Sequence, residues 1–146
     1  MNVRDAREAD ASALASIAGA PTDVLGDLIH DRTVRIAEDV RTDPTVDAER
    51  TKFSGENPEN ILGFVSFDAD SDVVTVTKLD GTKSAYDRLL DEPIGFARTE
   101  SMGVEALVTA DRTDVVDALE AKGFSRVEEG PRFEGADTVL FRLELR

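Results

Sequence analysis

Apolar and polar residues alternate along the chain with two different periods, and these periods predict its secondary structure. Segments with every second residue apolar indicate strands, and apolar residues three and four positions apart indicate helices packed on one side. The last strand is the clearest, because Val139, Phe141, Leu143 and Leu145 alternate with other residues. The expected strands are 3–4, 33–38, 61–67, 73–79, 104–110, 124–129 and 138–145.

The helical segments carry recognisable start and stop signals. In the first, Leu14, Ala15 and Ala18 share a face, Asp10 can cap the beginning and Gly19 the end. The expected helices are 10–18, one that follows Thr22, a piece that follows Gly81, a second piece over about 93–102, and one capped by Thr113 or Asp114 and closed by Gly123.

The helix after Gly81 is expected to break. Ala85, Tyr86, Leu89 and Leu90 form a helical stripe. Pro93 then disfavours a helical conformation at the preceding residue. We therefore predict two helical pieces that meet at an angle.

Residues 39–60 are predicted to form a long polar loop, because they contain two prolines, a glycine and many charges. Loops of this length serve as functional lids or mobile segments, or they are simply acidic, solvated connections. The sequence leaves both readings open. The expected strands and helices follow one another in the order β-α-α-β-β-β-α-β-α-β-β. This order predicts one mixed α/β domain that spans residues 1–146 and includes the long loop.

Composition excludes several classes of protein. The chain has no cysteine, so disulfides, thiolate metal sites and a cysteine nucleophile are ruled out. No apolar stretch approaches the length of a membrane span, and the first ten residues are too charged for a signal peptide. We expect a soluble, cytoplasmic protein.

The net charge is the strongest compositional feature. Thirty-one acidic and 17 basic residues give a formal charge of −14, and only four of the basic residues are lysines. Such a surface repels nucleic acid and anionic lipid, so neither is an expected partner. An Asp-rich, Lys-poor composition is typical of cytoplasmic proteins of salt-accumulating halophiles.

Stability is therefore expected to depend on salt. As KCl rises from about 0.1 M to about 1 M, the Debye length falls from about 10 Å to about 3 Å, and the acidic residues repel one another less. The melting temperature should rise markedly over this range. A melting temperature that stays constant would remove the argument for adaptation to high salt.

The order of elements resembles that of the GCN5-related N-acetyltransferases, the GNAT family. VRDAREADASALASIAG (3–19) is similar to the opening strand and helix of the family, and Gly123-Phe124 stands where a helix ending in Gly-Phe precedes the last two strands. The resemblance implies a single-domain GNAT-like fold with a mixed, mostly antiparallel central sheet flanked by helices. The acidic composition suggests a divergent member of haloarchaeal type.

The family signature is an Arg or Gln, two residues, a Gly, one residue, and a Gly or Ala. Its amides hold the pyrophosphate of coenzyme A, and the preceding strand pairs with the pantetheine arm. Lys78, Gly81 and Lys83 occupy the three positions here, so two of them are substituted, and the usual spacer before the motif is lacking. The resemblance implies acetyl-CoA as cosubstrate, bound by Val76, Thr77, Lys78, Leu79, Gly81, Thr82, Lys83 and Ser84.

The residues themselves allow two interpretations of this turn. Gly81 permits a tight turn and close approach of a phosphate, and Lys78 and Lys83 are half of the lysines in the chain. On this interpretation Gly81→Val blocks the phosphate and changes stability only modestly. The other interpretation is a capped helix start with solvated lysines and no ligand.

Acetyl transfer to an amine needs a base for the amine and an acid for the leaving thiolate. The family often supplies the acid as a tyrosine in the helix before Gly-Phe, but Leu119 stands at that position. The only tyrosine, Tyr86, is a weak catalytic candidate, because its spacing favours a core residue. Asp72 and Glu105, near the central strands, are the weak candidates for the base.

The only histidine, His30, ends a helix, where an exposed cation is favoured by the helix dipole, and a catalytic role for it is the less favoured alternative. With one histidine and no cysteine, no metal is expected. We thus predict an acetyl-CoA-dependent transferase acting on a small-molecule or peptide amine; a homodimer stays open. The alternatives are a non-catalytic GNAT-fold binding or assembly module, and a structural domain without a ligand.

Overall fold

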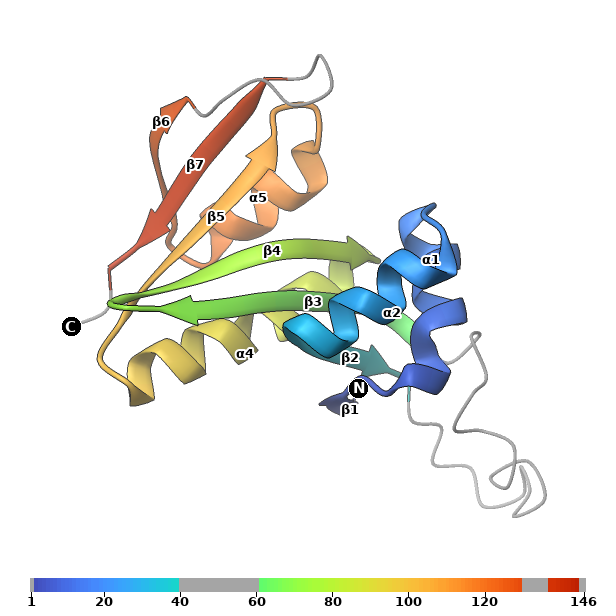
Figure 1. Cartoon of the computed structure of the whole chain (residues 1–146). Helices are drawn as coiled ribbons and strands as arrows, with labels where there is room; N and C mark the ends of the chain where they lie inside the picture. Colours follow the sequence, from blue (N-terminus) through green and yellow to red (C-terminus); the bar gives the residue numbers. More distant parts are fainter. Residues whose placement is uncertain (1, 40–60, 130–136, 145–146) are drawn as a thin grey trace.

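The computed structural model describes residues 2–39, 61–129 and 137–144, which form a sheet of seven strands with helices on both faces (Figure 1). The strand order is β1-β2-β3-β4-β5-β7-β6, and all neighbours are antiparallel except β4 and β5. The expected fold class is confirmed. The strands are β1 (Asn2–Asp5), β2 (Thr33–Glu38), β3 (Ile61–Asp70), β4 (Val73–Gly81), β5 (Gly103–Thr109), β6 (Ser125–Glu129) and β7 (Thr138–Leu143).

The helices are distributed over the two faces of the sheet. α1 and α2 pack against one another and against β2, β3 and β4, whereas α4 crosses β2 to β5 and contacts α5 (Figure 1). No helix in the described ranges is both long and apolar enough to cross a membrane. The helices are α1 (Ala11–Ala18), preceded by a short 3-10 helix (Glu8–Asp10), α2 (Thr22–Asp31), α4 (Lys83–Thr99) and α5 (Thr113–Ala121).

The side chains of β3 alternate between the two faces of the sheet, and each face has its own hydrophobic core. Phe64 packs with Leu14 and Leu25 beneath α1 and α2. Its neighbour Val65 belongs to the larger core with Tyr86 beneath α4. Successive side chains of a strand point to opposite faces, so a strand buried on both sides reads as the mostly apolar segment 61–67. The predicted loop 39–60 lies outside the described residues except for Asp39.

The predicted break at Pro93 is wrong, because α4 is one continuous helix. Proline removes one backbone hydrogen bond, to the carbonyl of Leu89. Leu90, Pro93, Ile94 and Ala97 are all buried, so the helix is packed against the sheet on both sides of the proline. We infer that this burial outweighs the lost hydrogen bond.

Gly81 lies at the end of β4, where two backbones approach closely. It pairs with Gly63 of β3, and a Cβ built on Gly81 would lie 2.3 Å from the Leu62 carbonyl oxygen and 2.4 Å from the Gly63 Cα. Its φ of +130° is in the region that side chains rarely adopt. The expectation that Gly81→Val changes stability only modestly is therefore wrong: the fold itself requires this glycine.

A buried ion pair fixes the first strand to the start of α1. Arg4 donates to both carboxylate oxygens of Asp10, at 2.8 and 2.9 Å, and the Arg7 amide donates to the same group at 2.8 Å. The Asp10 side chain is 1% exposed. Burial raises the pKa of Asp10, but the hydrogen bonds from Arg4 and Arg7 outweigh burial and hold it below its usual 3.8.

Asp10→Asn is expected to destabilise the protein by about 2 kcal/mol at neutral pH, because it leaves Arg4 without its buried partner. A carboxylate with a lowered pKa stabilises the fold above the unfolded pKa and loses that effect as pH falls through the folded value. The difference between wild type and variant should therefore be constant from pH 7 to 5 and shrink below about pH 4. Denaturant unfolding over a pH series measures this.

Asp68→Asn is the matched control, since Asp68 forms an ion pair with Arg32 in which both side chains are well exposed. Exposed pairs contribute little, so this variant should unfold like wild type at every pH. A constant Asp10→Asn difference down to pH 2 would contradict the assignment of a carboxylate with a lowered pKa.

Candidate active-site cleft

The two halves of the sheet separate at its centre. β4 and β5 pair in parallel only from Val73 with Gly103 to Val76 with Ala106. Beyond this point β4 continues to Gly81 beside β3, and β5 continues to Thr109 beside β7. The strands diverge visibly in Figure 1. This confirms the expectation that 73–79 lies beside 104–110 or splays from it.

A cavity of about 350 Å³ fills the gap between the diverging strands. Its walls come from both strands, from α5 and from the start of β7, and most of them are aliphatic. Pockets of this size and character are typical of small-molecule sites. The lining residues are Val76, Thr77, Lys78, Leu79, Ala106, Leu107, Val108, Thr109, Arg112, Val115, Leu119 and Thr138.

Thr77 is an extra residue in β4 at the point where the strands part. Ser66 pairs with Lys78 but Phe67 pairs with Val76, so Thr77 has no partner in β3. Its hydroxyl lies 2.5 Å from that of the fully buried Ser66. Bulges of this kind re-aim a side chain beside a functional site, and here the re-aimed residue lines the cavity.

The signature turn is only partly available to a ligand. The Thr82 amide donates to the Leu62 carbonyl at 2.9 Å, so it cannot also hold a phosphate. Because hydrogen-bonded and non-hydrogen-bonded pairs alternate in an antiparallel ladder, the amide of Gly81 then points away from β3. The amides of Lys83 and Ser84 begin α4 and have no acceptor within the helix.

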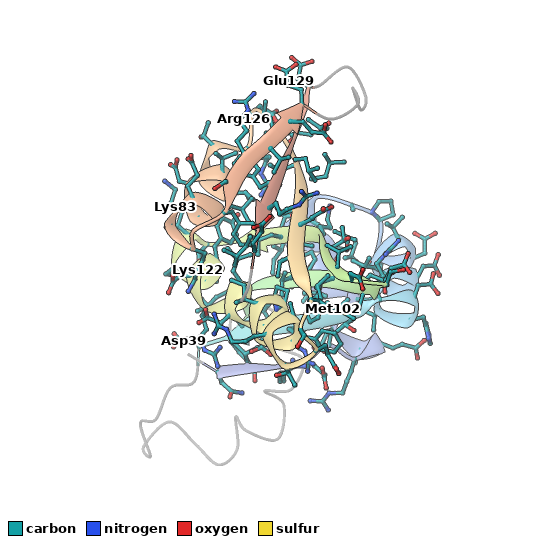
Figure 2. The ribbon with its side chains drawn as sticks, turned by 90° about the vertical axis from the view of Figure 1, so that its left-hand side faces the viewer. Asp39, Lys83, Met102, Lys122, Arg126 and Glu129 are labelled. Carbon is teal, nitrogen blue, oxygen red and sulfur yellow. The ribbon has the colours of Figure 1, made fainter. Side chains whose placement is uncertain are left out.

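The turn is also a well-formed helix start, as the second interpretation predicts. Thr82 is the N-cap residue, and its hydroxyl accepts from the Ala85 amide at 3.3 Å. Lys83 is exposed, on the edge of the molecule where Lys122 also lies and where α4 and α5 pack together (Figure 2). Of the predicted cofactor residues, Val76, Thr77, Lys78 and Leu79 line the cavity, whereas Gly81, Thr82, Lys83 and Ser84 do not.

Arg112, which is not among the site residues expected from the sequence, lies across the mouth of the cavity. Its Nη2 donates to the Leu79 carbonyl at 3.2 Å and to the Tyr86 hydroxyl at 3.3 Å, and lies 3.0 Å from Asp80. The cations that the sequence pattern places at the turn are Lys78 and Lys83. The predicted cap of α5 was also wrong, because Arg112, rather than Thr113 or Asp114, is the N-cap residue.

Tyr86 is a core residue whose hydroxyl reaches this mouth. It is 1% exposed, and its hydroxyl donates to Asp114 at 2.9 Å. Burial, and then the hydrogen bond to the Asp114 carboxylate, raise the pKa of Tyr86 to about 12. The phenol therefore keeps its proton at neutral pH and acts as a fixed hydrogen-bond donor.

The remaining catalytic candidates do not line the cavity. Asp72 is in the turn before β4, about 17 Å along the strand from Thr77 at about 3.3 Å per residue. Glu105 belongs to the paired part of β5 and is bound to Arg142 at 2.6 Å. His30 is exposed and bonded to Glu8, whose hydrogen bond and charge raise the pKa of the imidazole.

Leu119 occupies the place at which the family resemblance implies a tyrosine, and it lines the cavity. Within the described ranges, no cavity-lining residue is a carboxylate, a histidine or a tyrosine. Nor do the described residues include a cluster of three or more acidic or histidine side chains that could hold a metal ion.

Comparison with known proteins rests on structure, since neither the family models nor the curated proteins include a match to this sequence. A protein of Desulfovibrio desulfuricans described as an acetyltransferase of the GNAT family superimposes with a TM-score of 0.70 at 15% identity, over 98% of both chains.

Two further structures cover both chains nearly completely. NAA60 of Arabidopsis thaliana in complex with a bisubstrate analogue gives a TM-score of 0.71 at 16% identity, over 97% of this chain and 96% of that one. The same plant protein is also known in complex with acetyl-CoA. Ribosomal-protein-alanine N-acetyltransferase of Brucella melitensis gives 0.69 at 16% identity, over 99% of this chain and 100% of that one. The chain therefore has the fold of the GNAT acetyltransferases.

Proposed function

We propose that the protein binds acetyl-CoA in the cleft between β4 and β5 and transfers the acetyl group to a small-molecule or peptide amine. The observation that carries this proposal is the separation of the two strands after Val76 and Ala106, which leaves one edge of β4 unpaired beside a mostly aliphatic cavity. An extended amide-bearing chain such as pantetheine can pair with such an edge as an added strand would.

The residues of the cleft suit different parts of the ligand. The Leu79 carbonyl faces the cleft, because Arg112 donates to it. The aliphatic walls exclude water from the thioester, and the Thr77 hydroxyl, held by Ser66, can donate to an oxygen or sulfur that gains charge during transfer. Gly81, Lys83 and Ser84 can offer amides to the phosphates at the start of α4.

The amine must supply its own free electron pair. Since the described cavity lining holds no carboxylate or histidine, the amine has to arrive unprotonated or lose its proton to water. The rate of transfer should therefore rise with pH through the pKa of the amine itself.

The direct test is the release of coenzyme A from acetyl-CoA in the presence of a panel of small amines and peptide N-termini. The chain contains no cysteine, so every thiol that a thiol reagent detects comes from the cosubstrate. Amine-dependent release above the rate of hydrolysis supports the transferase. The assay is best run in molar KCl, because we further propose that the protein is a divergent, haloarchaeal-type cytoplasmic protein, a proposal supported by its charge of −14.

A non-catalytic binding or assembly module is the second candidate. It is favoured by Leu119, an aliphatic residue on the cavity wall where the family resemblance implies a tyrosine. Binding of coenzyme A without amine-dependent thiol release would favour the module over the enzyme.

A further inference from the structure

Arg112 contacts the three elements that surround the mouth of the cleft, which are β4, α4 and α5. One guanidinium reaches Leu79 and Asp80 at the end of β4, Tyr86 in the first turns of α4, and, through Nε at 3.5 Å, Asp114 at the start of α5. It lines the cavity, and its side chain is partly exposed. The cation is therefore within reach of both a bound ligand and solvent.

This arrangement opposes the entry of a ligand in two ways. The Leu79 carbonyl that Arg112 occupies belongs to the edge of β4 with which an extended ligand would pair. In addition, Asp80 places a carboxylate beside the start of α4, where it would repel a phosphate. Asp80 also attracts the second cation that lines the cavity, since Lys78 Nζ lies 3.8 Å from it.

We propose that Arg112 is the cationic side chain that binds the phosphates at the cleft, beside the amides at the start of α4, and that Asp80 holds it across the mouth until coenzyme A displaces it. On entry, the guanidinium leaves the Leu79 carbonyl and Asp80 and pairs with the phosphates. Its planar, forked donors match phosphate oxygens better than an ammonium does. Arg112 thereby takes over part of the phosphate binding from the signature turn, in which two positions are substituted and the Thr82 amide is already bonded to Leu62.

This inference rests on the proposed function. Comparing the binding of two ligands tests the role of Arg112 separately from the binding of coenzyme A itself. Coenzyme A carries phosphates and pantetheine does not, so only the former should depend on Arg112 as a phosphate ligand. Titration calorimetry at one fixed KCl concentration gives the Kd of each ligand for wild type, Arg112→Gln and Asp80→Asn. Arg88→Gln is the matched control, because Arg88 lies on α4 with Glu92 as its partner and its loss changes the net charge equally.

Arg112→Gln is expected to raise the Kd of coenzyme A by about tenfold relative to Arg88→Gln, and to leave the Kd of pantetheine unchanged or lower. Asp80→Asn should lower the Kd of coenzyme A severalfold, because it frees Arg112 and Lys78 and removes a repulsive charge. If Arg112→Gln does not fold, the Asp80→Asn result decides: unchanged or weaker binding of coenzyme A overturns the proposal.

Other outcomes show whether the role of Arg112 or the proposed function has failed. Equal Kd values of coenzyme A for Arg112→Gln and Arg88→Gln overturn the role of Arg112 and leave the proposed function standing. A loss of coenzyme A and pantetheine affinity by the same factor would mean that Arg112 only shapes the cleft. If neither wild type nor Asp80→Asn binds coenzyme A, the proposed function fails and this inference fails with it.

Discussion

Replacing Gly81 by alanine is expected to destabilise the protein by about 3 to 5 kcal/mol, enough to unfold much of a marginally stable domain. Two costs add together. The backbone at Gly81 has a φ of +130°, which strains any residue with a Cβ. The added Cβ would also lie 2.3 Å from the Leu62 carbonyl oxygen, which belongs to the backbone and cannot rotate away. Denaturant unfolding measures the loss.

Gly95→Ala is the control with the opposite expected sign. Gly95 lies inside α4 with open space around the position of a Cβ, so alanine should stabilise the helix by up to about 1 kcal/mol. A Gly81→Ala variant as stable as wild type, with only its affinity for coenzyme A reduced, would show that the glycine serves a phosphate and not the pairing of β3 with β4.

The second large effect is expected from filling the cavity. Leu107 lines the cavity and is 42% exposed, so Leu107→Trp can be accommodated at the surface while the ring reaches into the cleft. Because the ring and a pantetheine arm cannot share one volume, the Kd of coenzyme A should rise by about a hundredfold or more. Calorimetric titration of the folded variant gives this ratio.

Val127→Trp is the matched control, since Val127 lies on β6, is 44% exposed and does not line the cavity. Both substitutions add the same ring to a half-exposed position of the sheet, so a general effect of the ring would appear in both. Equal affinities of the two variants for coenzyme A would place the ligand outside the cleft.

Much of the fold could be predicted from local patterns. Alternation located the strands, including most of the one expected at 138–145: β7 spans Thr138–Leu143, and its alternate residues Val139 and Phe141 are buried. The break at Pro93 was predicted wrongly because the rule for proline is local, whereas the burial of Ile94 and Ala97 that keeps α4 continuous is tertiary. The role of Gly81 was missed for a similar reason: its partner, Gly63, is far away in the sequence and comes close only through strand pairing.

The candidate site could be predicted only where it follows from the order of elements. Residues 76–79 line the cleft because they begin at the point where β4 leaves β5. Arg112 could not be predicted from the motif, because it lies at the start of α5, 28 residues or more beyond the turn in the sequence. Only the fold brings it close to the turn, where its guanidinium lies 3.0 Å from Asp80. A search for cations at the start of the helix after the next strand would have found it.

Calorimetric titration of the wild-type protein with acetyl-CoA in molar KCl tests the central claim most directly. If the cleft between β4 and β5 is a cofactor site, one equivalent should bind with measurable heat, and saturating ligand should raise the melting temperature by mass action. No heat of binding and an unchanged melting temperature at saturating acetyl-CoA would contradict the claim and leave the turn at Gly81 as a simple joint between strand and helix.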